Sequence, residues 1–126
     1  MKLSILITED REDIRNHIQE ELNDLGYETD VATSGKECID KIRNKTPDIL
    51  ILDIMMEGIS GIEVLRKIKN KVKDIYIIAN TIVLRDNLEK QIFEMGANAY
   101  VEKPALFSEL LYEINKGVEL ITKKKT

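Results

Sequence analysis

The sequence is poor in cysteine and has no long apolar run. Its one cysteine, Cys38, excludes a disulfide within the chain and a metal site built from several cysteines. No segment has the roughly 20 apolar residues that a membrane-crossing helix needs. We expect no signal peptide, because only a few apolar residues separate Lys2 from Glu9. We therefore expect a cytoplasmic protein without membrane contact, in which Cys38 is a small core residue.

The sequence also lacks an excess of basic residues, internal repeats and low-complexity linkers. It has 19 Lys and Arg against 23 Asp and Glu, and the net charge of −4 argues against direct nucleic-acid binding by this domain. A length of 126 residues suits one domain, and 43% apolar residues suffice for a core. We expect this domain at residues 1–122 and a solvated basic C-terminal tail at residues 123–126.

Short apolar segments alternate with segments of helical periodicity along the whole chain. The apolar segments predict strands at residues 4–8, 27–32, 49–52, 75–79 and 99–101. Between and after them, apolar residues recur at spacings of three and four and predict five helices, the last ending at about Thr122. The residues expected on the buried helix faces are Ile14, Ile18, Leu22 and Leu25; Cys38, Ile39 and Ile42; Val64, Leu65 and Ile68; Leu88, Ile92 and Met95; and Leu106, Leu110, Ile114 and Val118.

Signals for helix ends support these boundaries. Gly26 and Gly96 come just after the first and fourth helices, where C-terminal caps are expected. A residue that caps helix starts, followed three positions later by glutamate, predicts a capping box at the start of the second, third and fourth helices. The three predicted boxes are Ser34 with Glu37, Ser60 with Glu63, and Asp86 with Glu89.

Five repeats of strand and helix predict an α/β fold with a parallel sheet. The apolar segment at residues 49–52 does not alternate with polar residues, which is typical of a strand buried on both faces. Right-handed crossovers then place helices on both sides of the sheet. We predict a flavodoxin-like (βα)5 three-layer sandwich with strand order 2-1-3-4-5. The more polar segment 27–32 fits the edge position that this order gives it.

Chemically active residues follow four of the predicted strands. Glu9 and Asp10 come after the first strand, and Asp53 comes directly after the third. Thr81 follows the fourth strand and Lys103 the fifth. The carboxyl ends of parallel strands meet at one edge of the sheet, where ligands bind in such folds. We therefore expect three carboxylates, one hydroxyl and one ammonium group to converge there.

This group of residues suits phosphoryl chemistry on a carboxylate. Three adjacent carboxylates repel one another, and a divalent cation relieves that repulsion. The ligands are all oxygens and include no His or Cys, which favours Mg2+ over zinc. Lys103 and Thr81 offer a positive charge and a hydroxyl to an anion, so Asp53 is predicted to accept a phosphoryl group. Each residue alone has a structural explanation: charges at a helix start, a turn-forming Asp, a solvated loop lysine or an ordinary strand threonine.

Taken together, these motifs resemble a response-regulator receiver domain of two-component signalling. The resemblance runs from about Lys2 to the fifth helix and rests on residues in a fixed order. They are Glu9 and Asp10, the block from Asp53 to Gly61, Thr81, the segment from Gly96 to Val101, and Lys103 with Pro104.

The resemblance implies a role for each matching residue. Asp53 would be the phosphoacceptor, receiving its phosphoryl group from a phosphohistidine. Lys103 would pair with the phosphoryl oxygens or with Asp53, and Thr81 would hydrogen-bond to the phosphoryl group. Tyr100 stands at the switch aromatic position. The residues implied for Mg2+ are Asp10 and Asp53 through their carboxylates, Met55 through its backbone carbonyl, and Glu9 through water. The peptide bond between Lys103 and Pro104 would be cis.

The resemblance also implies partners. The phosphoryl donor would be a sensor histidine kinase or a phosphotransfer protein. The output would pass through the face formed by the fourth helix, fifth strand and fifth helix, toward a downstream effector protein or a fused output domain. A phosphorylation-dependent homodimer belongs to the same expectation. Such a domain catalyses only its own phosphorylation and dephosphorylation, so it is not an enzyme acting on a separate substrate.

Departures from the family pattern keep other functions open. Glu57 stands where proline is frequent, Asn80 where an apolar residue is usual, Ile82 where a small residue is usual, and Ala105 where a large apolar one is common. These changes motivate the alternative of a pseudo-receiver, an interaction module that no longer uses phosphorylation. A metal-dependent phosphohydrolase with an aspartate nucleophile is disfavoured, because 126 residues leave no cap region. His17, the one histidine, is expected on the solvated side of the first helix rather than in a phosphotransfer role.

Overall fold

Five parallel strands form one sheet in the order β2-β1-β3-β4-β5. The structure is a computed structural model, and it describes residues 2–82 and 87–125. The strand bounds are β1 Ser4–Thr8, β2 Glu28–Ala32, β3 Ile49–Leu52, β4 Tyr76–Thr81 and β5 Ala99–Glu102. The predicted strand order is confirmed, and β2 lies at an edge. β4 extends two residues further than the predicted strand, so Asn80 and Thr81 belong to it.

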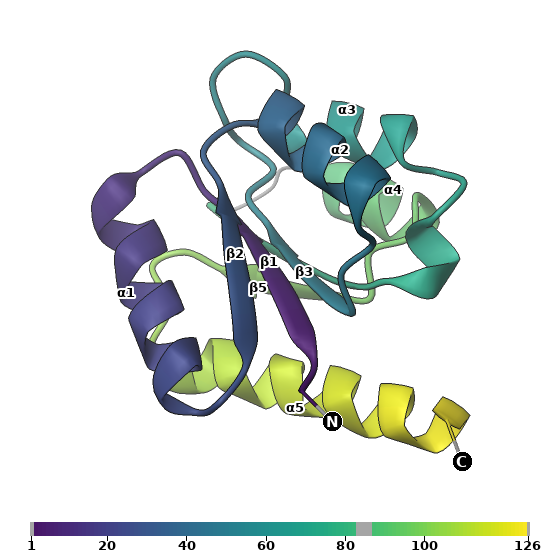
Figure 1. Cartoon of the computed structure of the whole chain (residues 1–126). Helices are drawn as coiled ribbons and strands as arrows, with labels where there is room; N and C mark the ends of the chain where they lie inside the picture. Colours follow the sequence, from purple (N-terminus) through teal and green to yellow (C-terminus); the bar gives the residue numbers. More distant parts are fainter. Residues whose placement is uncertain (1, 83–86, 126) are drawn as a thin grey trace.

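Helices cover both faces of the sheet (Figure 1). Their bounds are α1 Glu12–Asp24, α2 Gly35–Asn44, α3 Gly61–Lys67, α4 Leu88–Glu94 and α5 Phe107–Lys125, with a short 3-10 helix η1 at Val72–Asp74. α1 and α5 pack on one face, and α2, α3 and α4 pack on the other. The three-layer sandwich predicted from the sequence is therefore confirmed.

The central strand β3 shows why its sequence does not alternate. All four of its side chains are buried, with Ile49 and Ile51 in the cluster under α1 and α5. Leu50 and Leu52 lie in the other cluster, under α2, α3 and α4. Because helices cover both faces, every position of the strand faces a core. Cys38 is fully buried in the cluster under α2, α3 and α4, as predicted.

The helix starts form only part of the predicted capping boxes. The Ser34 hydroxyl accepts a hydrogen bond from the Glu37 amide at 3.2 Å, but the Glu37 carboxylate accepts from the Thr33 amide at 2.5 Å rather than from that of Ser34. At α3, Ser60 accepts from the Glu63 amide at 3.4 Å, while the Glu63 carboxylate pairs with Arg66. Asp86, in the third predicted box, lies outside the described residues.

Two leucines predicted on buried helix faces are exposed. Leu25 follows the last residue of α1 and is 54% exposed, and Leu106 precedes α5 and is 70% exposed. Each leucine continues the apolar spacing of its helix but lies just outside it, Leu25 after α1 and Leu106 before α5. Phe107 packs against the core beside Leu106. α5 continues to Lys125, past the predicted end at about Thr122.

Two further expectations concern the backbone and the membrane. The peptide bond between Lys103 and Pro104 is cis, as the resemblance implies. Gly26 and Gly96 have φ of 91° and 116°, the left-handed conformation that helix C-terminal caps use. Among the helices of residues 2–82 and 87–125, none is both long and apolar enough to cross a membrane.

Candidate functional site

The candidate site is built where β1 and β3 end side by side. Thr8 pairs with Leu52 in the sheet, and the ladder continues one step further because the Asp53 amide donates to the Thr8 carbonyl at 3.1 Å. The Glu9 amide likewise donates to the Ala32 carbonyl at 3.1 Å. Backbone hydrogen bonds of the sheet thus fix the positions at which the first and third strands present their acids.

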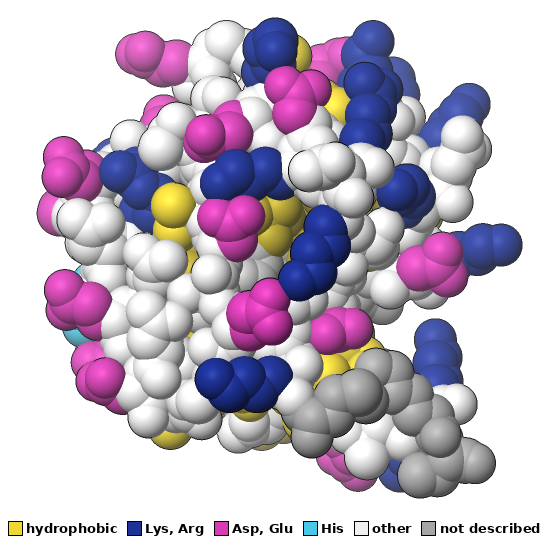
Figure 2. Space-filling view, in the orientation of Figure 1, with side chains coloured by type: hydrophobic (Ala, Val, Ile, Leu, Met, Phe, Trp, Pro, Cys, Tyr) yellow, Lys and Arg dark blue, Asp and Glu magenta, His cyan; other side chains and the backbone are white. Residues whose placement is uncertain are grey.

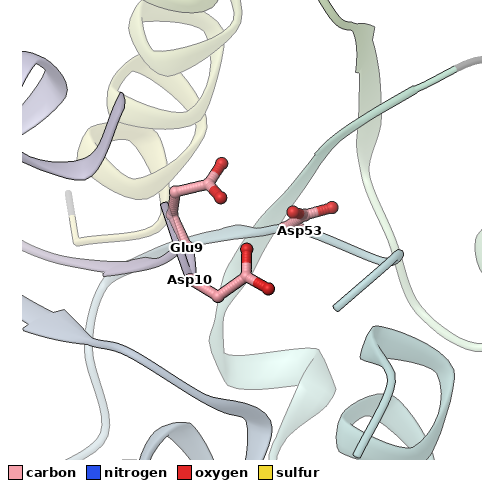
Figure 3. Close-up of side chains that lie close together, drawn as sticks. All are labelled: Glu9, Asp10 and Asp53. Carbon is pink, nitrogen blue, oxygen red and sulfur yellow. The ribbon is translucent and has the colours of Figure 1, made fainter. Parts of the chain in front are cut away.

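The three acids predicted from the sequence converge (Figure 3). Glu9, Asp10 and Asp53 each offer a carboxylate oxygen, and these oxygens lie within 4.8 Å of one another. Glu9 and Asp53 are only 3% and 5% exposed, whereas Asp10 is exposed. Two buried carboxylates beside a third are costly without a compensating positive charge.

Lys103 supplies that charge from the loop after β5. Its Nζ donates to Asp53 Oδ2 at 3.0 Å and also to Glu9 Oε1. Burial lowers the pKa of Lys103, but hydrogen bonds to Glu9 and Asp53 outweigh it, so the pKa lies above its ordinary value. Burial raises the pKa of Glu9, and the neighbouring ammonium only partly offsets this effect. Lys103 is therefore protonated at neutral pH and joins the two buried acids.

The second oxygen of Asp53 is held by the backbone of the following loop. The Met55 amide donates to Asp53 Oδ1 at 3.0 Å and lies 3.3 Å from the Thr81 hydroxyl, which also accepts from it. Thr81 is fully buried at the end of β4. Because Asp53 and Thr81 share the Met55 amide as a donor, the predicted Thr81 hydroxyl lies next to Asp53. The predicted role of the Met55 backbone carbonyl as a Mg2+ ligand stays a prediction.

Two residues that support the site, Arg11 and Arg15, were not predicted from the sequence, and the role of a third, Gly61, becomes clear only in the structure. The Arg11 amide donates to Glu9 Oε2 at 3.1 Å, and the Arg15 guanidinium donates to the Glu9 carbonyl at 3.0 Å. A Cβ on Gly61 would lie 2.6 Å from Ile54 Cα and 2.8 Å from the carbonyl oxygen of Asp53. The two arginine contacts involve the backbone, and no motif in the sequence marks them. Gly61 ends the block of residues 53–61 that carries the resemblance, but the sequence does not reveal how closely it approaches Ile54 and Asp53.

The donor set fits magnesium. All the side-chain donors in the acidic cluster are carboxylate oxygens, which a hard cation such as Mg2+ prefers, and Asp10 remains accessible to solvent. Lys103 pairs with only two of these acids. The site therefore has oxygen ligands of suitable chemistry, and an additional positive charge there would be favourable.

Three of the four residues that depart from the family pattern, Asn80, Ile82 and Ala105, line one cavity near Thr81 and Lys103. Tyr100 donates its hydroxyl to the Ile82 carbonyl at 3.1 Å, and Asn80 Nδ2 donates to the Val101 carbonyl at 3.0 Å. The Ile82 side chain is 53% exposed. With Lys103 and Ala105, it lines a cavity of about 440 Å³ beside the acidic cluster.

His17 also lines this cavity, on α1. It is exposed, as expected, and its ring meets the Phe107 ring edge-on, with centroids 6.5 Å apart. The predicted phosphoacceptor, its lysine, its hydroxyl and the acidic cluster thus lie together, whereas His17 belongs to a neighbouring surface.

Comparisons with known proteins give a consistent result. The family model described as "Response regulator receiver domain" matches residues 5–115. The chain is 33% identical over 113 residues to "Response regulator MprA" of Mycobacterium tuberculosis (strain H37Rv), an alignment covering 88% of this chain and 48% of that protein. The chain thus spans about half the length of the curated relatives it matches.

Solved structures show the same fold. The response regulator TrrA of Thermotoga maritima, solved in complex with Mg2+ and BeF, is 38% identical with a TM-score of 0.79, covering 93% of this chain and 99% of that one. A CheY-like receiver domain protein of Methanospirillum hungatei is 28% identical with a TM-score of 0.89, covering 98% and 99%. Both superpose over nearly their whole length.

Proposed function

The chain belongs to the response regulator receiver domain family, and on that premise we propose that Asp53 accepts a phosphoryl group from a phosphohistidine of a partner protein. One observation carries the proposal. The buried Asp53 carboxylate lies between the Lys103 ammonium and the Met55 amide, beside two other acids at the carboxyl edge of the sheet. Such a carboxylate is oriented and has positive charge ready for an incoming phosphoryl group.

The transfer forms one bond and breaks one. An oxygen of Asp53 bonds to phosphorus while the phosphorus–nitrogen bond of the donor histidine breaks. The imidazole nitrogen leaves with the electron pair and takes up a proton. Lys103 already contacts Asp53 Oδ2, and in this proposal it neutralises charge on the phosphoryl oxygens. The chain acts in this step only on itself, as is typical of receiver domains, which are not enzymes with separate substrates.

We assign magnesium to the acidic cluster. Asp10 and Asp53 would hold the ion through their carboxylates, Glu9 through water and Met55 through its backbone carbonyl. When bound, Mg2+ supplies positive charge that offsets the negative charge of the phosphoryl oxygens. The carboxylate oxygens within 4.8 Å of one another support this assignment, as does the relative from Thermotoga maritima that was solved with Mg2+ and BeF.

Phosphorylation would then change the surface beyond β4. The new oxygens attract the Thr81 hydroxyl, which lies 3.3 Å from the Met55 amide. Movement of Thr81 shifts Ile82, whose carbonyl accepts from the Tyr100 hydroxyl. The shift biases the face formed by α4, β5 and α5 between two arrangements, with Tyr100 as the switch residue.

Partners follow from this mechanism. The donor is a sensor histidine kinase or a phosphotransfer protein in the cytoplasm, where response regulators usually act. The receiver occupies residues 1–122, with 123–126 as its basic end. It passes the signal to an effector protein or a fused output domain, and phosphorylation promotes a homodimer.

The test is intact mass spectrometry after incubation with acetyl phosphate and Mg2+. Wild-type protein should gain one phosphoryl group that is stable in acid and lost in base. Asp53→Asn should gain none while keeping the circular dichroism spectrum of the wild type. The matched control is Asp40→Asn, which removes an exposed carboxylate of α2 and should label like the wild type.

A pseudo-receiver that no longer uses phosphorylation is the competing function. The half-exposed Ile82 side chain beside Lys103 favours it, since a bulky group there narrows the approach to Asp53. Absence of labelling in folded wild-type protein, with both acetyl phosphate and Mg2+ present, would select this alternative. Labelling that persists in Asp53→Asn would reject Asp53 as the acceptor.

A further inference from the structure

A cluster of basic residues lies away from the acidic site. Between residues 66 and 73 the chain carries Arg66, Lys67, Lys69, Lys71 and Lys73 and no acid, although its net charge is −4. Arg66 and Lys67 stand in the last turn of α3, where cations are favoured by the helix dipole. The remaining three lysines follow the helix, so the helix dipole does not account for their positions.

Most of these cations have no anionic partner. Lys67, Lys69 and Lys73 are exposed and form no ion pair with the residues that the structure describes. Arg66 pairs with Glu63. Lys71 instead donates to the Ile42 carbonyl at 3.3 Å at the end of α2.

The fold brings a further lysine to the same place. Lys73 of η1 and Lys124 of α5 line one groove of about 460 Å³, although they are far apart in the sequence. The apolar side chains of Val72, Leu120 and Ile121 line the groove between them, and Leu120 is 48% exposed. The groove therefore combines an accessible apolar surface with unpaired positive charge.

Two acids, Asp48 and Asp74, also line the groove and contribute negative charge to it. The Asp48 carboxylate is engaged, since its Oδ2 accepts from the Ser4 amide at 2.9 Å and from the Ser4 hydroxyl at 3.3 Å. Asp74 is exposed beside Lys73. In the space-filling view, dark-blue Lys and Arg side chains predominate on the upper right flank, near α3 in Figure 1 (Figure 2). The lining itself therefore holds two lysines and two carboxylates, and the excess of positive charge lies in residues 66–71, the segment that leads into the groove.

The groove lies at the opposite edge of the sheet from the acidic cluster. It is lined by Tyr76, the first residue of β4, and by Asn98, which directly precedes β5. The acidic cluster lies instead where the strands end. A molecule bound in the groove would thus leave access to Asp53 open.

We propose that this groove binds an acidic peptide segment of a partner protein, with an apolar side chain of that peptide placed on Val72 and Leu120. The flanking lysines attract carboxylates, and the apolar lining gains from burial of a large side chain. A nucleic-acid backbone would use the lysines but leave the apolar lining uncovered. A lipid surface is flat and would not enter the groove. The acidic peptide uses both features.

Fluorescence anisotropy tests the proposal with a fluorescein-labelled helical peptide of Glu and Leu. Wild-type protein should bind it, and affinity should fall as salt is added. Lys73→Glu/Lys124→Glu should weaken binding by about tenfold or more, as expected when attraction becomes repulsion. The matched control is Lys36→Glu/Lys90→Glu, which changes the net charge equally on exposed positions of α2 and α4 and should bind like the wild type.

Three results would overturn the proposal. Equal losses in the groove variant and the control would reduce the binding to a non-specific charge effect. Equal affinity for a peptide with Ser in place of Leu would remove the role of the apolar lining. Tighter binding of duplex DNA or of phosphatidylserine vesicles would assign the surface to another kind of partner. Asp53→Asn should bind the peptide like the wild type, so this test is separate from that of phosphorylation.

Discussion

At the scale of single residues, the site depends on one ammonium group shared by two buried acids. The side chains of Lys103, Glu9 and Asp53 are 15%, 3% and 6% exposed, so the charges interact across little water. Removing one partner from a buried ion pair leaves an uncompensated charge, which costs more than the pair itself contributes. In this site the removal of Lys103 would leave two such charges.

We predict that Lys103→Met lowers the free energy of unfolding by about 2–4 kcal/mol at pH 7 without metal, because Glu9 and Asp53 then lack a cation. Mg2+ should restore more stability to this variant than to the wild type, since the ion replaces the missing charge. Urea unfolding with and without Mg2+ measures both effects. Lys45→Met, which removes an exposed pair with Glu28, should change the free energy of unfolding far less, because solvent screens that pair. Equal losses in both variants would contradict the argument.

A second prediction concerns access to Asp53. Ile82→Ala should speed labelling by acetyl phosphate or hydrolysis of the product, because a smaller side chain widens the approach beside Lys103. The Tyr100 hydrogen bond goes to the backbone carbonyl of residue 82 and survives the substitution. Leu106→Ala shortens another exposed side chain of the same cavity and serves as the control. Time courses of intact mass measure the rates of labelling and of hydrolysis. If both rates were unchanged in Ile82→Ala, steric control of access to Asp53 by residue 82 would be excluded.

At the scale of elements, the sequence was sufficient to predict the strands and their order. Apolar segments such as residues 49–52 predict buried strands, and alternation with helices leaves few arrangements. Gly26 and Gly96 also mark helix ends as predicted, but the predicted burial failed for two leucines beside helix ends. Leu25 and Leu106 continue an apolar period, but periodicity does not reveal where the chain leaves the helix, and both side chains are exposed.

The candidate site was predictable to the same degree. Strand ends place Glu9, Asp53, Thr81 and Lys103 at one edge, and the structure brings them together. The contact between Lys103 and Asp53 was expected from the family resemblance, and the structure confirms it. The other contacts were not predictable. That Lys103 also contacts Glu9, or that Met55 offers its amide to Asp53 and Thr81, depends on loop conformations that pattern and propensity do not specify.

The start of α3 yields a prediction at this scale. Gly61→Ala should destabilise the protein by about 1–3 kcal/mol, because the new methyl group would lie 2.6 Å from Ile54 Cα and 2.8 Å from the Asp53 carbonyl oxygen. Alanine favours a helix by about 1 kcal/mol over glycine, but these backbone atoms belong to the site loop and have little freedom to move. Urea unfolding and labelling rate should both change. A gain in stability would show that the helix start adjusts without strain.

At the scale of the whole molecule, one sheet connects the proposed magnesium site to both cores. β1 and β3 end in the acids and also contribute side chains to both apolar clusters. A ligand that binds only the folded arrangement of these strands stabilises the entire domain by mass action. Cys38 lies in the cluster under α2, α3 and α4 and is fully buried, so its thiol reports on opening of that core.

The last prediction uses this thiol. Burial raises the pKa of Cys38 to about 11, so the folded protein holds almost no thiolate at pH 8 and labelling by DTNB must pass through an opened state. The labelling rate should therefore level off near an ordinary thiol pKa of about 8.5 instead of rising toward pH 11. Mg2+ should slow labelling in the wild type but not in Asp10→Asn, because the ion stabilises the closed fold only where its ligands remain. If Mg2+ slowed urea unfolding and left labelling unchanged, α2 would be opening by itself, independently of the strands that carry the site.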